Sequence, residues 1–206
     1  MVQSDSLPME PMQTEERRLT VERNVPVDAL YMAFHMCSRN HPDYYAFDML
    51  SDLLSSGRSS RFVQHLVQDK QIFNSIDAYI SGSIDNGLFH IVGKPAPEKT
   101  LEEAEKAIWE ELALLTEGSI DENELEKVKN RYESEQIFNN LNYLNVATNL
   151  AYFELIGKAE DINTEVEKYR SVTQEQIKRA AKQTFLPENC SVLYYKAAAK
   201  GASHTP

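Results

Sequence analysis

The histidines are the first test of whether this chain could hold a catalytic metal ion. There are five, His35, His41, His65, His90 and His204. No two of them show the H-x-x-E-H, H-E-x-x-H or H-x-x-x-H spacing that brings ligands together on one helix. Because a zinc site needs three or four converging ligands, the sequence predicts no metal ligand and no catalytic residue here. His35 and His90 fall in predicted strands, where a structural role is the commoner one.

Motifs for nucleophilic catalysis and for phosphate binding are also missing. The sequence contains neither a G-x-S-x-G nucleophile elbow nor a G-x-x-x-x-G-K phosphate loop. One corner, Gly57-Arg58-Ser59-Ser60-Arg61, carries two arginines at the start of a predicted helix. Arg58 and Arg61 could hold a carboxylate or a phosphate there. The alternative is a capped corner between two helices, with both arginines in water.

Acidic residues form the largest charge feature. Residues 102–135 contain twelve acidic and four basic side chains, which gives this segment a net charge of −8. Two interpretations stay open: the wet face of two long helices, or an acidic wall that attracts cationic peptides. The acidic residues are Glu102, Glu103, Glu105, Glu110, Glu111, Glu117, Asp121, Glu122, Glu124, Glu126, Glu133 and Glu135.

Composition limits the class of protein. The chain has 206 residues, 42% of them hydrophobic and 26% charged, as expected for one soluble globular domain. The net charge of −11 argues against a nucleic-acid partner. No apolar run approaches the roughly 20 residues that span a bilayer. The acidic start is not a signal peptide, but one could precede this sequence, so the compartment stays open between cytoplasm and periplasm. Cys37 and Cys190 fit small buried hydrophobes.

Alternating apolar residues predict the strands. Residues 29–37 form the strongest strand and are placed at the centre of a sheet because both faces are apolar or small. Residues 17–24, rich in charge, suit a protected edge. Residues 75–81 and 88–92 predict a hairpin, with its turn at Asn86-Gly87. Residues 189–195 predict a closing strand.

Helical spacing and capping signals predict the helices. Two helices should flank the arginine corner, the first closed by a left-handed Gly57 and the second capped by Ser59 or Ser60. A further helix, around residues 144–156, ends near Gly157. Capping boxes start three more helices. Their paired residues are Thr100 with Glu103, Ser119 with Glu122, and Thr173 with Gln176.

This order of elements predicts the α+β class, a two-layer sandwich in which a mostly antiparallel sheet carries helices on one face. Residues 1–15, with two prolines and no periodicity, are predicted to be a flexible lead-in or linker. Residues 16–196 would form the domain. Residues 197–206 lack a core-forming pattern and are predicted to be a disordered tail.

The succession of motifs resembles one family over about residues 17–196. The matching pieces are HPDYYAFDMLSDLLSSGRSSRFVQHLV, then IDAYISG, SIDENELEKVKNRY and the long run TNLAYFELIGKAEDINTEVEKYRSVTQEQIKRAAKQTFLPENCSVLYY. Each piece is degenerate, but their order and spacing are specific. They resemble the pitrilysin/insulinase zinc peptidases, which include the mitochondrial processing peptidases. Within that family, the resemblance is to the second, metal-free domain of a half-molecule.

The resemblance implies that zinc is held by an absent sibling domain and that this domain closes a peptide chamber over it. Many members also supply an arginine and, a few residues later, a tyrosine that hold substrate. Here the arginine position falls at Val67 or Gln68 and the tyrosine position at Asn74. Valine cannot polarise a carbonyl, and the two amides hydrogen-bond it only weakly. Gln68, Asn74, Arg58 and Arg61 are therefore the candidate substrate-binding residues.

Three functions follow, in order of preference. The first is the metal-free domain of a zinc metalloendopeptidase, which walls a peptide chamber and binds the zinc-bearing sibling domain or subunit. The second is a catalytically inactive structural or assembly subunit, favoured by the missing arginine–tyrosine pair. The third is a peptide-binding module that adds an extended ligand to an exposed strand edge. An H-x-x-E-H motif in the preceding segment or a neighbouring gene would support the first.

Overall fold

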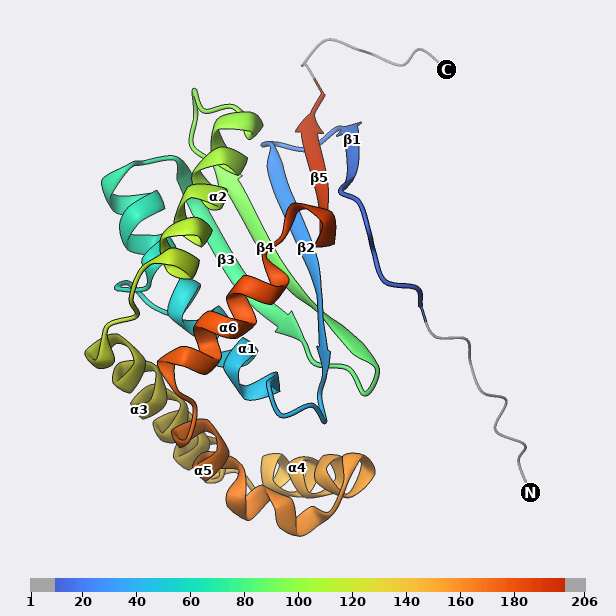
Figure 1. Cartoon of the computed structure of the whole chain (residues 1–206), viewed down its shortest axis with the longest axis vertical. Helices are drawn as coiled ribbons and strands as arrows, with labels where there is room; N and C mark the ends of the chain where they lie inside the picture. Colours follow the sequence, from blue (N-terminus) through green and yellow to red (C-terminus); the bar gives the residue numbers. More distant parts are fainter. Residues whose placement is uncertain (1–9, 199–206) are drawn as a thin grey trace, which may run out of the picture.

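In the computed structural model, which describes residues 10–198, five strands form one sheet and the principal helices pack on one of its faces (Figure 1). The predicted α+β two-layer sandwich is thus confirmed. Residues 1–9 of the predicted lead-in and 199–206 of the predicted tail lie outside the described residues. The strands are β1 (Arg17–Arg23), β2 (Ala29–Ser38), β3 (Phe73–Ser81), β4 (Asn86–Pro95) and β5 (Cys190–Ala197).

Most of the helices lie between the hairpin and the last strand. Two come earlier, α1 (Tyr44–Ser55) and the π-helix η1 (Phe62–Asp69). None of the helices in residues 10–198 combines the length and hydrophobicity that crossing a bilayer requires. The later elements are α2 (Leu101–Glu117), α3 (Glu122–Asn139), α4 (Tyr143–Ile156), η2 (Ala159–Thr164), α5 (Glu165–Arg170), α6 (Gln174–Thr184) and η3 (Pro187–Asn189).

The sheet has the order β1-β5-β2-β4-β3. β1 pairs with β5 in parallel, and every other neighbouring pair is antiparallel. β2 occupies the centre and β1 an edge, as the sequence predicts. Because β5 inserts between β1 and β2, the first and last strands of the chain lie side by side. The complete five-stranded sheet therefore needs strands from both ends of the domain.

Side chains from one face of the sheet build the core. Alternate residues of β2 and β4 are buried under α1, α2 and α6, among them Leu30, Phe34 and Ile91, which are at most 1% exposed. α1 adds Leu50 and Leu54, also fully buried. The inward residues of the strands and the apolar residues of α1 thus face each other on the same side of the sheet. Among the described residues no helix covers the opposite face.

The two cysteines behave as small core residues. Both are free, Cys190 buried and Cys37 half-buried. Burial raises the pKa of the Cys37 thiol to about 11 and that of Cys190 to about 12. Both thiols therefore stay protonated at neutral pH, and neither is an activated nucleophile.

Two of the three predicted capping boxes are present. Thr100 with Glu103 starts α2, and Thr173 with Gln176 starts α6, each with both reciprocal hydrogen bonds. The prediction of a box at Ser119 is wrong. Asp121 caps α3 instead, its carboxylate accepting a hydrogen bond of 2.7 Å from the Asn123 amide. An aspartate two residues closer to the helix adds a charge that favours the positive helix start.

Two other local predictions need correction. Gly57 does take the left-handed conformation, with φ of +86°. Neither Ser59 nor Ser60 caps the next helix, because the Ser60 hydroxyl donates to the Gly57 carbonyl at 2.7 Å and the π-helix begins at Phe62. Asn86 does not lie in the hairpin turn. It belongs to β4 and pairs with Ser38 of β2, so the tight-turn prediction is wrong.

Gly93 offers a test of the sheet register. It lies between Leu30 and Ile76 on β4, and a Cβ atom there would come within 2.7 Å of Cδ1 of the buried Phe73 ring. We expect Gly93→Ala to lower the free energy of unfolding by about 1–3 kcal/mol through overpacking. Urea denaturation measures this. In a Phe73→Leu background the same substitution should cost less, and an equal cost in both backgrounds would contradict the packing.

Candidate functional site

Two of the residues proposed to bind substrate lie together. Gln68, on η1, donates from Nε2 to the carbonyl oxygen of Arg58 at 3.3 Å. Both residues are exposed. Asn74 is also exposed and lies on β3, an edge strand, where the pairing with β4 is irregular between Phe73 and Ser75. These three residues can be reached by a ligand, but they line neither of the two hollows described below.

Arg61 has protein partners of its own. Its guanidinium donates two hydrogen bonds of 2.9 Å to the Glu124 carboxylate and a longer one of 3.4 Å to the Ser119 carbonyl. This bidentate pair joins the start of η1 to α3. A substrate carboxylate would have to displace Glu124 to reach the Arg61 side chain.

The acidic segment is more than a wet helix face. Glu105 and Glu111 are only 6% and 2% exposed. Glu105 accepts hydrogen bonds from Arg18, Trp109 and Tyr194. Burial alone would raise the pKa of Glu105, but these hydrogen bonds, that of Arg18 first, outweigh it and lower the pKa. The carboxylate therefore stays ionised and ties α2 to β1 and β5.

The uncovered face of the sheet carries the first hollow. Its volume is about 340 Å³, and Leu19, Tyr31 and His90 are among the residues that line it. Leu19 is 61% exposed and Tyr31 40%. The strand register aligns the side chains of this face in rows: Leu19, Leu193, Tyr31, Val92 and Asp77, then Arg17, Ser191, Ala33, His90 and Tyr79.

Aromatic rings and imidazoles set the chemistry of this open face. The His90 ring stacks on Tyr79, with centroids 4.9 Å apart and planes 19° apart. Burial lowers the pKa of His90, which keeps the ring neutral at pH 7. His35 lies on the same face, its Nε2 3.5 Å from a Glu10 carboxylate oxygen. Such a surface can stack on and hydrogen-bond a peptide, but it holds no activated nucleophile.

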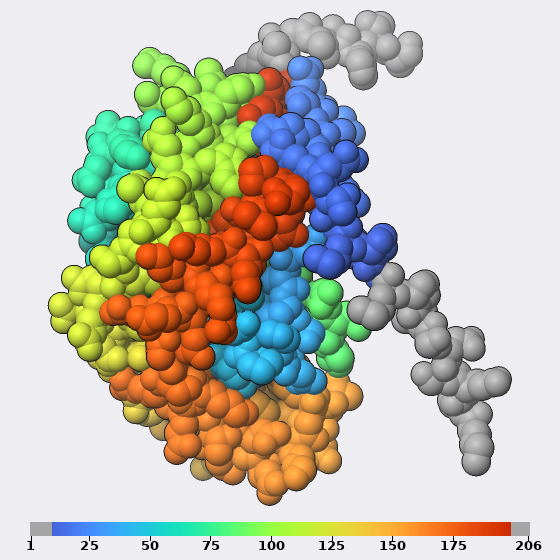
Figure 2. All heavy atoms as spheres, in the orientation of Figure 1, coloured from blue at the N-terminus to red at the C-terminus, as the bar shows by residue number. Residues whose placement is uncertain are grey.

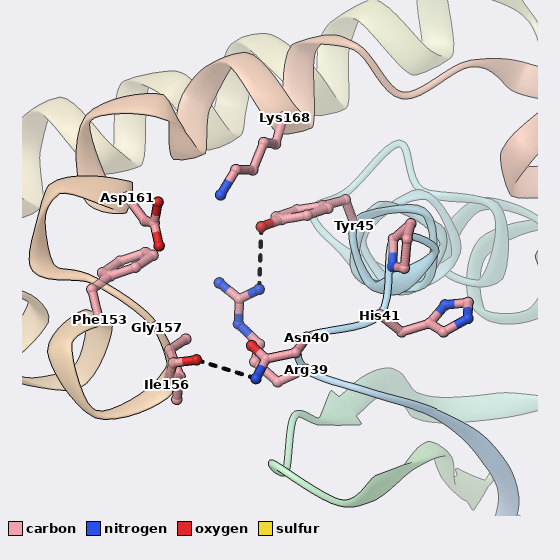
Figure 3. A pocket seen from close by; sticks show the side chains of 10 residues that line it. Arg39, Asn40, His41, Tyr45, Phe153, Ile156, Gly157, Asp161 and Lys168 are labelled. Carbon is pink, nitrogen blue, oxygen red and sulfur yellow. Dashed lines mark hydrogen bonds between the residues drawn. The ribbon is translucent and has the colours of Figure 1, made fainter.

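A second hollow, of about 240 Å³, lies where β2 and α1 meet the end of α4. Figure 3 shows Arg39, Tyr45 and Lys168 turned toward the same space, with Phe153 and Asp161 across from them. Arg39 donates to the Tyr45 hydroxyl at 3.4 Å. Its guanidinium carbon also lies 4.4 Å from the centroid of the Tyr44 ring.

Arg39 is fixed from several sides. Its guanidinium forms an ion pair with Glu165, and both side chains are only 8% exposed. The Tyr45 hydroxyl donates to the other Glu165 oxygen at 3.0 Å. The sequence analysis missed this cluster because 126 residues separate Arg39 from Glu165. No local pattern signals such a pair, which can be found only once the fold is known.

Two half-buried carboxyl groups of α1 follow, Asp48 near this cluster and Asp52 one helical turn further along. Asp48 accepts a hydrogen bond from the Tyr169 hydroxyl, yet its pKa is raised, chiefly by burial. Burial and then the charge of Asp48 raise the pKa of Asp52 to about 6. A carboxyl that holds its proton more tightly when folded makes the fold less stable as pH rises.

Within residues 10–198 no group of three or more histidine, cysteine, aspartate or glutamate side chains is placed to hold a metal ion. The zinc of the resembled family therefore does not fit the described part of this chain. The two hollows can bind and orient a ligand through their aromatic and charged side chains.

The family follows from the sequence as well as from the fold. Residues 3–132 match the family described as the peptidase M16 inactive domain. The chain belongs to this family. The resemblance to the metal-free domain of a pitrilysin/insulinase-type peptidase is confirmed.

Relatives extend this identification. The chain is 25% identical over 170 residues to the uncharacterized zinc protease YmxG of Bacillus subtilis, and 23% identical over 188 residues to the zinc protease PqqE of Helicobacter pylori. These matches cover 82% and 91% of this chain, but only 41% and 42% of the relatives. The chain therefore spans less than half the length of the curated relatives that it matches.

A solved structure confirms the fold. A protease from Helicobacter pylori superposes on 94% of this chain with a TM-score of 0.85, at 22% sequence identity. The match uses 48% of that protease chain. At this identity the likeness establishes the architecture alone.

Asp52 gives a pH-dependent test of the carboxyl pair on α1. Its contribution to the free energy of unfolding should fall as pH rises from about 4 to above 6, because the folded state binds the Asp52 proton more tightly. Asp52→Asn should reduce this fall and raise stability at pH 7.5 by about 1–2 kcal/mol. Urea titrations at several pH values measure it. Asp77→Asn, at an exposed site on β3, should leave the profile unchanged.

Proposed function

We propose that this chain is the metal-free domain of a zinc metalloendopeptidase, that its open sheet face walls a peptide chamber, and that it binds the zinc-bearing sibling. The observation that carries the proposal is the uncovered sheet face. It has a hollow of about 340 Å³, lined by tyrosine, histidine, arginine and aliphatic side chains, and no group of three metal ligands lies among the described residues. Zinc-dependent cleavage of a peptide at this face would use an ion held by the sibling part.

The relatives support the zinc-bearing sibling. YmxG and PqqE are named zinc proteases, and this chain corresponds to about two fifths of each. The described part of this chain lacks a three-ligand group. The remaining length of a parent protein, or a separate subunit, would supply the ion, and the two parts would close around the substrate.

Peptide binding at the open face would use general features of strand surfaces. The exposed Tyr31 and Tyr79 offer rings for stacking. The edge strand β3 offers unpaired backbone groups to an extended chain. Gln68, Asn74 and Arg58, near the start of β3, are proposed as secondary polar contacts for substrate. Arg61 could contact substrate only if the substrate displaced Glu124 from its guanidinium.

A structural or assembly role is the second candidate. Val67 packs partly buried against the core and Asn74 is an amide, so neither supplies the guanidinium or hydroxyl that many family members present. A domain without these groups can still stabilise its partner. The two candidates differ in whether the assembled protein cleaves peptides.

The test uses the full chain together with the H-x-x-E-H-bearing segment of its gene or of a neighbouring gene. We expect peptidase activity that a chelator removes and zinc restores, and none from this chain alone. Tyr31→Ala combined with His90→Ala should raise KM several-fold with little change in kcat, because these side chains would contact bound substrate more than the reacting bond. Fluorogenic peptides measure both constants.

Leu114→Ala, at an exposed site on α2 outside the open face, is the matched control and should leave both constants unchanged. A stable complex without chelator-sensitive cleavage would favour the structural role. A chain that cleaves peptides alone, through its own histidines, would contradict the proposal.

A further inference from the structure

α4 presents an apolar stripe away from the body of the domain. Leu144, Ala147, Ala151 and Leu155 recur at helical spacing and are all exposed. Phe153, the only buried residue of α4, projects from the opposite side of the helix. We call the four exposed residues the α4 outer stripe. A surface helix normally turns its apolar stripe toward the core. α4 differs, because it buries Phe153 on one side and exposes an apolar stripe on the other.

More apolar side chains surround the turn between α3 and α4. Ile137 is 61% exposed, Phe138 70%, Leu141 74% and Tyr143 91%. In Figure 2 the segment that follows the turn, coloured orange, forms one end of the molecule, beyond the sheet and α1. The turn and the α4 outer stripe together form what we call the hairpin surface.

The hairpin surface lacks charge. Residues 136–156 contain a single charged side chain, Glu154, in a chain of which 26% is charged. Asparagines supply most of the remaining polarity. Depletion of charge with enrichment in aromatic and aliphatic residues is typical of the centre of protein–protein interfaces. It does not suit a cationic peptide, an anionic ligand or a nucleic acid, each of which needs opposite charge.

The stability of α4 also points to a partner. Isolated helices of fewer than about 12–15 residues are marginal in water, and helices in proteins depend on packing of an apolar face. α4 has 14 residues and buries only Phe153. Asn40 adds one hydrogen bond of 3.2 Å to the Ile156 carbonyl. Burial of the hairpin surface would stabilise the helix and remove exposed apolar area from water.

From these observations we infer that the hairpin surface is the docking site for the zinc-bearing sibling. This inference rests on the proposed function and adds the surface by which the two parts meet. The occupant follows from length and charge. The relatives extend over more than twice the length of the match, so each of them carries a further part at least as long as the matching region. Because residues 136–156 carry a single charge, the facing surface of such a part would need apolar side chains and no compensating charge.

The experiment measures binding of the full chain to the immobilised H-x-x-E-H-bearing segment. Leu144→Glu and Leu155→Glu, at residues each 73% exposed, should weaken binding at least tenfold. Their melting temperatures should match that of the wild-type chain, because neither side chain is part of the core. Leu114→Glu on α2, at a residue 58% exposed, is the matched control and should bind like the wild type.

Each other outcome overturns a defined part of the proposal. Wild-type binding that neither hairpin variant weakens would overturn the docking surface and leave the proposed function standing. A wild-type chain that fails to bind the zinc-bearing segment would overturn both. A dimer of this chain alone, detected by light scattering and broken by Leu144→Glu, without binding to that segment, would make a second copy the occupant and overturn the inference.

Discussion

One-sided coverage of the sheet is the constraint on which the rest of this structure depends. Alternation along β2 sends Leu30 and Phe34 into the core under the helices, and the same alternation sends Tyr31 outward. Because successive side chains of a strand point to opposite faces, burying one set of residues places the other set on the opposite face. The outward face must then stay wet or meet another protein. Its aromatic rings and small side chains are compatible with contact to water or to a protein. They do not select one position of an extended ligand along the strands.

A buried ion pair connects the sheet to the segment that follows the α3–α4 helix pair. Arg39 follows the end of β2, and Glu165 opens α5, just after the hairpin. Both side chains are almost fully buried, so removing Glu165 would leave the Arg39 charge without its ion-pair partner at low dielectric. The stack on Tyr44 and the hydrogen bond from Tyr45 restrict the geometry further. The pair, together with the packing of Tyr169 on Tyr45 and Tyr132, thus fixes where the α3–α4 helix pair leaves the domain.

The sequence predicts what local rules control and misses what distant contacts control. Apolar or small residues on both faces placed β2 at the centre, and reciprocal threonine caps placed the starts of α2 and α6. The Ser119 cap failed because Asp121 competes for the same helix start, and the Asn86 turn failed because β2 extends β4 by pairing. Arg39 and Glu165 leave no local signal at all. The substrate-binding assignment of Gln68 and Asn74 stays a prediction, since their exposure permits it without selecting it.

The two exposed surfaces differ in the kind of contact that each can make. The open sheet face combines tyrosine, histidine and arginine around a hollow. Such polar groups can stay hydrated when no ligand is bound, which allows a peptide to bind and leave. The hairpin surface is apolar and nearly uncharged, so leaving it in water has a continuing free-energy cost. A chamber wall has to release its ligand, whereas a docking face has to keep its partner. We therefore propose reversible peptide contact for the open sheet face and lasting protein contact for the hairpin surface.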